Sequence, residues 1–377
     1  MRYCTYGLLM ILVLDAARVK AFGDQPLLFT HKSDVGMPCL SPNGKALAVI
    51  TSDRDVFLWN VQTQTKQRLV EGRAVTEEDE YPQLTNVQFS PDSQKLATID
   101  CVRGIVRVWK IEERGQAKLW KTLRIAHLTE EGMVSVEFTS KGEELVVAAR
   151  FLLLPNKLKA DGSGEFDVDG KGPFGLAFLI RKYDIASGRN VPISRKYSWS
   201  TIVDIAVSPR GSRLFVSEFG VTRGTGAEFF RTRAIDLGTR KEVYRIAGCL
   251  GPITPSPNGK FVAGTHAGLF PSGTHLITKL WDMKTGRELH SFKESDALTG
   301  APSFSPDSRL MAFPATGKTV RVWNINEKRF ILTRTEKSQP DSVQFLPNGK
   351  LLAVAVDGKT VKLWNLTDAK LPKITRK

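Results

Sequence analysis

The 377-residue sequence predicts an all-β fold built from seven copies of one structural unit. Three observations support this prediction. A short turn motif recurs along the chain, and a run of β-forming residues follows each copy of it. A further segment then alternates apolar and polar residues and ends, in most copies, at a tryptophan. Alternation with a period of two between turns indicates antiparallel strands.

The turn motif is the clearest mark of the repeat. Five of the seven copies begin with Ser-Pro, and Asn, Asp or Gly follows. Proline fixes φ and the residues after it tolerate a left-handed backbone, so each copy suits a hairpin. The copies begin at Ser41, Ser90, Thr139, Ser208, Ser256, Ser305 and Leu346.

The segments after each turn predict two further strands. Residues 46–50 and 351–354 are typical of the first of them, and residues 320–324 and 361–365 are typical of the second. The later of these two strands, which is the third strand of the repeat, closes at an equivalent residue in every copy. These closing residues are Trp59, Trp109, Tyr183, Ile235, Trp281, Trp323 and Trp364.

This unit resembles the WD40 repeat, over about residues 27–366. Trp281-Asp282 is the one literal Trp-Asp pair, while Thr30-His31 and Ala126-His127 approximate the Gly-His pair of the family. We therefore expect the hydrogen-bond network typical of the family to be incomplete in most repeats. The resemblance implies a seven-bladed β-propeller of four-stranded antiparallel blades.

The two ends of the repeat array predict how the ring closes. The last repeat ends its third strand near Leu366, and residues 26–30 form a spare β-rich segment ahead of the first repeat. We expect this N-terminal strand to complete the last blade, because closure removes the open faces that a linear array of repeats would expose.

The first residues are typical of a secretory signal peptide. Arg2 supplies the positive start, residues 8–14 form an apolar run, and Val19 and Ala21 suit cleavage after residue 21. The run is too short to span a bilayer, which needs about 20 apolar residues.

The predicted organisation is a signal peptide at 1–21, a propeller at 22–366 and a basic tail at 367–377. We expect a secreted, periplasmic or envelope protein without a membrane span. An uncleaved anchor and a cytosolic start are the alternatives to a cleaved signal.

Charge and cysteine content narrow the function classes. The net charge is +15, which favours an acidic partner. Only Cys39, Cys101 and Cys249 follow the predicted signal, and none of them lies in a C-x-x-C pair. This excludes a disulfide scaffold and a zinc site of that type.

No local motif of catalysis or metal binding is present. The acidic segment 161–170 lacks the glutamate that a calcium loop starting at Glu165 needs in its twelfth position, which is Leu176. The five histidines form no H-E-x-x-H pattern, and no nucleotide-binding or nucleophile-elbow motif occurs. We therefore predict no metal, no cofactor and no enzymatic activity.

Departures from the repeat predict where a partner binds. The third, fourth and fifth repeats carry extra residues between their second and third strands. Equivalent loops of neighbouring blades lie side by side, so three consecutive insertions predict one raised surface. In the third repeat, apolar residues on both sides of the insertion predict a lengthened hairpin with its tip at 155–173. The candidate contact residues are Phe166, Phe174, Arg223, Phe229, Phe230, Leu269 and Phe270.

The sequence thus favours a monomeric, non-catalytic scaffold that binds a protein through this face. The alternative is a propeller enzyme, a hydrolase or oxidoreductase with its site at the central channel. Nucleic-acid binding ranks below the scaffold, because the basic residues form no clustered stripe.

Overall fold

The computed structural model describes residues 39–50, 55–60, 63, 65–71, 87–100, 104–112, 115–125, 133–153, 175–197, 200–221, 228–270, 273–292, 301–346, 349–356 and 360–366. Every regular element in these residues is a β-strand, and none is a helix long and apolar enough to cross a membrane. The chain divides into two compact units. The first comprises Met1–Ala74, Glu113–Gln116 and Gly251–Lys377, and the second comprises Val75–Glu112 and Ala117–Leu250.

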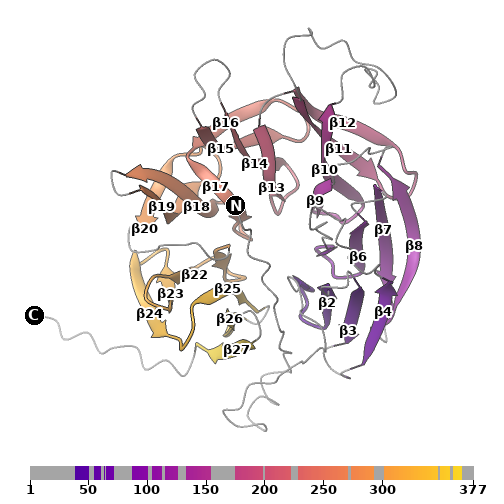
Figure 1. Ribbon diagram of the computed structural model, residues 1–377. Helices are drawn as coiled ribbons and strands as arrows, with labels where there is room; N and C mark the ends of the chain where they lie inside the picture. Colours follow the sequence, from indigo (N-terminus) through magenta and orange to yellow (C-terminus); the bar gives the residue numbers. More distant parts are fainter. Residues whose placement is uncertain are drawn as a thin grey trace, which may run out of the picture. The chain divides into compact units, whose positions relative to one another are not determined.

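The second unit contains three four-stranded antiparallel sheets in up-and-down order. Figure 1 shows each sheet running outward from its first strand, with β8, β12 and β16 at the outer edges. Their strands are β5 (Val87–Phe89), β6 (Lys95–Asp100), β7 (Ile105–Ile111) and β8 (Ala117–Arg124); β9 (Met133–Phe138), β10 (Glu144–Leu153), β11 (Gly175–Asp184) and β12 (Asn190–Tyr197); and β13 (Ser200–Val207), β14 (Arg213–Val221), β15 (Glu228–Asp236) and β16 (Glu242–Ala247).

The first unit contains four sheets of the same connectivity, one of which has three strands in the described residues. Their strands are β1 (Cys39–Leu40), β2 (Ala46–Ile50), β3 (Val56–Asn60) and β4 (Lys66–Val70); β17 (Cys249–Pro255), β18 (Phe261–Phe270), β19 (Gly273–Asp282) and β20 (Glu288–Phe292); β21 (Ser303–Phe304), β22 (Leu310–Ala315), β23 (Thr319–Asn324) and β24 (Arg329–Thr335); and β25 (Pro340–Phe345), β26 (Leu351–Val356) and β27 (Thr360–Asn365).

The recurring turn joins the first two strands of each sheet, as the sequence predicts. The Ser90 hydroxyl donates to Asp92 at 2.5 Å and accepts from the backbone N–H of Lys95 at 2.8 Å. Ser305 makes the same pair of bonds with Asp307 and Leu310. One serine hydroxyl thus satisfies two groups of the turn, which explains why serine opens most copies.

A second turn joins the third and fourth strands. Asp184, Asp236 and Asp282 each end a third strand and accept from the backbone N–H three residues later, at 2.7, 2.7 and 2.8 Å. The hydroxyl of that same residue, Ser187, Thr239 or Thr285, also donates to the carboxylate. The hydroxyl and backbone hydrogen bonds together stabilise the carboxylates and lower the pKa of all three aspartates.

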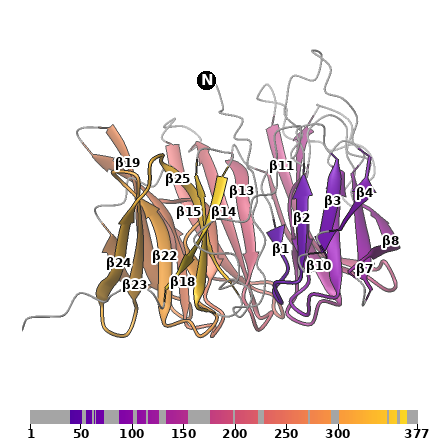
Figure 2. The ribbon, with the colours of Figure 1, turned by 90° about the horizontal axis from the view of Figure 1, so that it is seen from below.

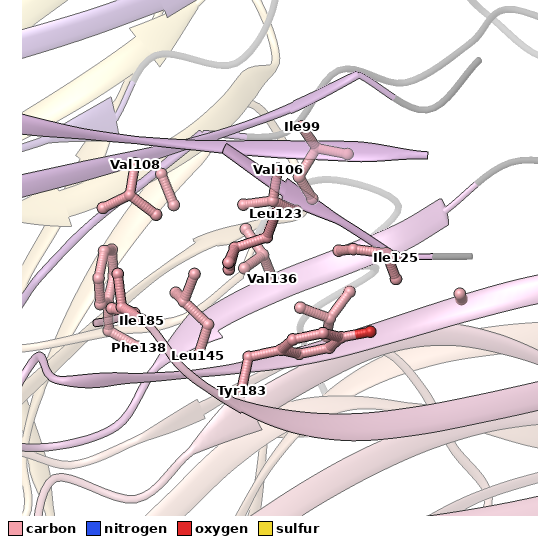
Figure 3. Close-up of a cluster of buried hydrophobic side chains, with 13 residues drawn as sticks. Ile99, Val106, Val108, Leu123, Ile125, Val136, Phe138, Leu145, Tyr183 and Ile185 are labelled. Carbon is pink, nitrogen blue, oxygen red and sulfur yellow. The ribbon is translucent and has the colours of Figure 1, made fainter. Parts of the chain in front are cut away.

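The apolar core of the second unit lies between neighbouring sheets. Figure 3 shows Val106, Leu123 and Ile99 from one sheet facing Leu145 and Tyr183 from the next. A second cluster joins Val146 and Ile180 to Leu214 and Val216 across the following interface. Because both faces of β6 are covered, four consecutive residues, Leu96–Ile99, are buried, whereas β7 starts with an alternation of buried and partly exposed residues.

The core of the first unit is rich in aromatic rings. His290 stacks on Trp323 with ring centroids 4.6 Å apart, and Phe292 meets the same indole edge-on at 5.2 Å. Burial lowers the pKa of His290, because the charged imidazolium loses hydration there.

The all-β prediction and its antiparallel sheets are confirmed. Each four-stranded sheet has the strand order of a propeller blade. The count of blades and the closure of a ring stay predictions, since residues 26–30 lie outside the described residues. The predicted signal at 1–21 and the tail at 367–377 lie outside them too.

Candidate functional site

The longest hairpins occur in the three repeats that carry extra residues. Strands β10 and β11 have 10 residues each, β14 and β15 have 9 each, and β18 and β19 have 10 each. In the third repeat the lengthened hairpin was predicted, and β10 and β11 confirm it. Figure 2 shows that β11 and β14–β15, all in the second unit, extend toward the same side.

The structure locates four of the seven predicted contact residues. Phe229 and Phe230 lie in β15 and Leu269 and Phe270 lie in β18, so all four belong to strands, whereas the sequence suggested loops. The backbone of Leu269 pairs with Thr274. The reason is that the inserted residues continue the ladder of the hairpin instead of leaving it. Phe166, Phe174 and Arg223 lie outside the described residues.

A charged cluster lies at the end of the β14–β15 hairpin. Glu218 of β14 is opposite Arg231 of β15 and is almost fully buried, with 3% of its side chain exposed. Arg231 donates from Nε to Glu218 Oε2 at 2.9 Å, and its Nη2 lies 2.8 Å from the same oxygen. The Arg231 guanidinium also lies over the Phe229 ring, 4.4 Å from the centroid. The cluster therefore joins an ion pair to an aromatic ring.

A second arginine shares the same carboxylate. Arg233 Nε donates to Glu218 Oε1 at 2.6 Å, and its side chain is 8% exposed. Glu242 of β16 lies 4.0 Å from Arg233 and accepts a hydrogen bond from Arg245. That bond raises the pKa of Arg245, whose side chain is 56% exposed. We call Glu218, Arg231, Arg233, Glu242 and Arg245 the arginine cluster.

The opposite face of the same hairpin is apolar at its end. Phe219 and Phe230 stack with their centroids 4.9 Å apart, and both are half-buried. On the same face, two residues further from the end of the hairpin, the buried hydroxyls of Ser217 and Thr232 form a hydrogen bond of 3.0 Å. The hairpin thus carries aromatic rings on both faces, next to the arginine cluster on one of them.

The repeat accounts for the cation at Arg233 but not for the one at Arg231. Two residues before the strand-closing position, the chain has a cation in almost every copy: Arg107, Arg181, Arg233, Lys279, Arg321 and Lys362. Four residues before it, the copies have Asp55, Ile105, Leu179, Arg231, Ile277, Thr319 and Thr360. Arg231 is the one cation at that position. Aligning the closing residues would have revealed it from the sequence.

A second polar group lies on the first strands of the second unit. Gln88 of β5 donates to Glu137 of β9 at 3.1 Å. Removal from bulk water raises the pKa of Glu137 well above its usual range, and the charge of Asp204 on β13 raises it further. Sequence reasoning missed this group because each residue comes from a different repeat and no local motif contains two of them.

The described residues hold no group of three or more His, Cys, Asp or Glu side chains able to bind a metal ion. The arginine cluster consists of three guanidiniums and two carboxylates. Its chemistry suits recognition of a negative group beside apolar surface.

Two comparisons with known proteins bear on the family. Residues 331–365, which span most of β24 and all of β25–β27, match the model of the WD domain, G-beta repeat. A 60-residue stretch is 38% identical to a coronin-like protein of Saccharomyces cerevisiae. That stretch is 16% of this chain and 9% of the yeast protein. Together with the repeated antiparallel sheets, these matches support the resemblance of the chain to the WD40-repeat family.

Proposed function

We propose that this protein is a non-catalytic scaffold that binds a partner protein through the ends of the long hairpins of its second unit, β10–β11 and β14–β15. WD40 repeats generally mediate protein–protein interaction. The observation that carries the proposal is the end of β14–β15, where Phe229 and Phe230 are half-buried beside Arg231. Aromatic residues and arginine are the side chains most enriched at the energetic centres of protein interfaces.

We further propose that the protein acts outside the cytoplasm, as its N-terminal sequence suggests. The partner is then expected in an envelope or extracellular fraction. An acidic partner fits the net charge of +15.

The test is affinity capture from envelope and soluble fractions with four baits. The first bait is the chain from Phe22, and the second has residues 156–172 replaced by Asn-Gly. The third carries Phe229→Ala and Phe230→Ala. The fourth is a control, Leu119→Ala, which removes an apolar side chain that is 45% exposed on β8, away from these hairpins.

We expect the first and fourth baits to capture the same protein, and the second and third to lose it. Circular dichroism must show that all four baits are folded. Equal capture by all four would contradict the proposed face, and capture by none would contradict the scaffold proposal.

A channel-centred enzyme is the second candidate, and Glu137 is the observation that favours it. Carboxyl groups with a raised pKa beside a second carboxylate occur often at catalytic sites. Elemental analysis and an absorption spectrum of the purified protein test this candidate. A stoichiometric metal or a bound chromophore would support it, and their absence would remove its metal- and cofactor-dependent forms.

A further inference from the structure

We infer that the end of the β14–β15 hairpin binds a carboxylate of an acidic segment in the partner protein, through the free edge of the Arg231 guanidinium. This inference rests on the proposed function and adds the chemical class of the partner to it. Four features of the arginine cluster support it.

The first feature is how Arg231 is held. A guanidinium has five N–H donors arranged as a planar fork. Glu218 takes the Nε and Nη2 side of the fork, at 2.9 and 2.8 Å. Within the described residues no hydrogen bond or ion pair of Arg231 uses Nη1, and the side chain is 20% exposed. One edge is therefore anchored while the other can receive a carboxylate from outside.

The second feature is that the anchor is rigid. Glu218 is 3% exposed and lies between two guanidiniums, with Arg233 on its other oxygen at 2.6 Å. The Phe229 ring covers one face of the Arg231 guanidinium. Because its position is already determined, Arg231 loses little conformational entropy when a ligand binds.

The third feature is the local charge. The arginine cluster contains three arginines and two glutamates, so it carries one positive charge in excess. A single added carboxylate would neutralise it. Charge-assisted bonds from arginine to a carboxylate are strong and bidentate where the geometry allows.

The fourth feature is that the repeat does not require Arg231. The cations two residues before the closing position recur in the other repeats, as in Arg107 and Lys279. At the Arg231 position the equivalent residues are mostly aliphatic or threonine, as in Ile277 and Thr319. Side chains that depart from a structural repeat are candidates for a function that the fold itself does not need.

The flanking surface favours a peptide over a polyphosphate. Phe229 lies against Arg231, and Phe219 and Phe230 stack on the other face of the hairpin. An acidic peptide can place a carboxylate on the arginine and an apolar side chain on a ring. Binding of a nucleic acid depends mainly on many exposed cations of the protein that contact its phosphates. Loss of any one of these cations should then weaken binding by a similar amount.

The experiment uses the full chain and a fluorescein-labelled peptide of alternating glutamate and leucine. A second peptide has glutamine in place of every glutamate, and a labelled single-stranded RNA is the third probe. Fluorescence anisotropy measures binding to wild type, Arg231→Gln, Arg231→Lys and Lys241→Gln. Lys241 is the control, because it is an exposed cation of the same sheet, at the turn before β16.

We expect the glutamate peptide to bind wild type and the glutamine peptide to bind far less. Arg231→Gln should weaken binding by about tenfold or more, the effect of losing a hydrogen bond between charged groups. Lys241→Gln removes the same charge and should weaken it by about twofold or less. Arg231→Lys should behave like Arg231→Gln, because lysine lacks the planar fork.

Three results with the peptides would overturn the inference. They are equal weakening by Arg231→Gln and Lys241→Gln, full binding by Arg231→Lys, and equal binding of both peptides. RNA binding that depends on Arg231 and not on Lys241 would also overturn it, in favour of a phosphate ligand. Thermal melts must show that Arg231→Gln remains folded. We expect it to fold, because Arg233 still pairs with Glu218 in this variant.

Failure of this inference can be told from failure of the proposed function. In the capture experiment, the Phe229→Ala, Phe230→Ala variant could lose its partner while Arg231→Gln keeps it. That result would support the scaffold function and contradict the proposal that Arg231 binds an acidic segment. If no bait captures a partner, the scaffold itself fails.

Discussion

At the scale of single residues, equivalent tryptophans have different surroundings in different sheets. Trp109 donates its indole N–H to the Thr98 hydroxyl at 3.1 Å, in a buried position. Trp364 ends the equivalent strand, and its Nε1 has no hydrogen-bond partner in the described part of the chain. The residue that corresponds to Thr98 there is Val354, because each lies opposite the cation two positions before its tryptophan.

This difference leads to a reciprocal prediction. Thr98→Val should lower the free energy of unfolding by about 1–3 kcal/mol, because it leaves a buried N–H without an acceptor. Val354→Thr should cost less than this, or stabilise the protein, because the new hydroxyl meets the unsatisfied N–H of Trp364. Urea denaturation measures both. A larger loss for Val354→Thr than for Thr98→Val would contradict the pairing.

Glu137 predicts a pH dependence of stability. The folded chain holds the Glu137 proton more tightly than the unfolded chain, since removal from water and Asp204 raise its pKa. The group stabilises the fold fully below the ordinary glutamate pKa of about 4.3, and that contribution is lost as pH rises through the raised pKa.

We therefore expect Glu137→Gln to flatten the fall in unfolding free energy as the pH rises above the ordinary glutamate pKa of about 4.3. Glutamine keeps the shape of the side chain and carries no charge beside Asp204. The exposed Glu143 provides the control Glu143→Gln. Parallel pH profiles for wild type and Glu137→Gln would show that this carboxyl does not control the dependence.

At the scale of elements, the turns of neighbouring sheets pack against one another. A side chain at Gly211 would approach the Ser140 hydroxyl to 2.6 Å, and one at Gly142 would approach Ser90 to 3.2 Å. In the first unit, the backbone N–H of Asn258 donates to the Ser308 hydroxyl of the next sheet at 3.0 Å. The turn motif therefore sets the spacing between sheets as well as closing each hairpin.

Gly211 and Gly259 form a matched pair for testing this packing. Both have a positive φ, +66° and +70°, but a side chain at Gly259 would meet nothing within 4 Å. Gly259→Ala should cost about 1 kcal/mol of backbone strain, and Gly211→Ala should cost about 1 kcal/mol more for displacing Ser140. Thermal unfolding measures the loss of unfolding free energy in each variant. Equal losses would contradict close packing between the turns at Gly211 and Ser140.

The elements also show why the repeat could be recognised. Six of the seven third strands combine a closing aromatic or aliphatic residue with a cation two positions before it, and the partners of those cations differ. Arg107 lies 3.6 Å from Asp100, Lys279 lies 2.8 Å from Glu288, and Arg321 lies over the Phe330 ring. The pattern within a strand is local and therefore predictable. The partners come from other strands and follow only from pairing.

At the scale of the whole molecule, charge is the dominant property. The chain carries a net charge of +15 and has a pI near 9.7. Like charges on a compact protein repel one another, which destabilises the folded state at low ionic strength. Salt screens this repulsion over a Debye length of about 30 Å at 0.01 M and about 10 Å at 0.1 M.

We expect the melting temperature at pH 7 to rise when sodium chloride increases from about 0.01 to about 0.1 M, because screening weakens the net repulsion. Differential scanning calorimetry measures it. Near the pI the net charge vanishes, so the same increase should have little effect there. A melting temperature that falls with salt at pH 7 would show that attractive ion pairs outweigh the repulsion.

The sequence by itself determined the strand-rich fold, the turns and the order of strands in each sheet. These depend on residues close in the chain, such as Ser90 with Asp92 and the alternation that ends at Trp109. It also indicated the lengthened hairpin of the third repeat and named the two phenylalanines of β15 as candidate contact residues. Only the tertiary structure decided that Phe229 and Leu269 belong to strands. It also decided that Glu218 is shared by Arg231 and Arg233, and that Glu137 meets Gln88 from another repeat. The physical reason is that ion pairing and desolvation depend on which strands become neighbours, and this information is spread over distant parts of the chain.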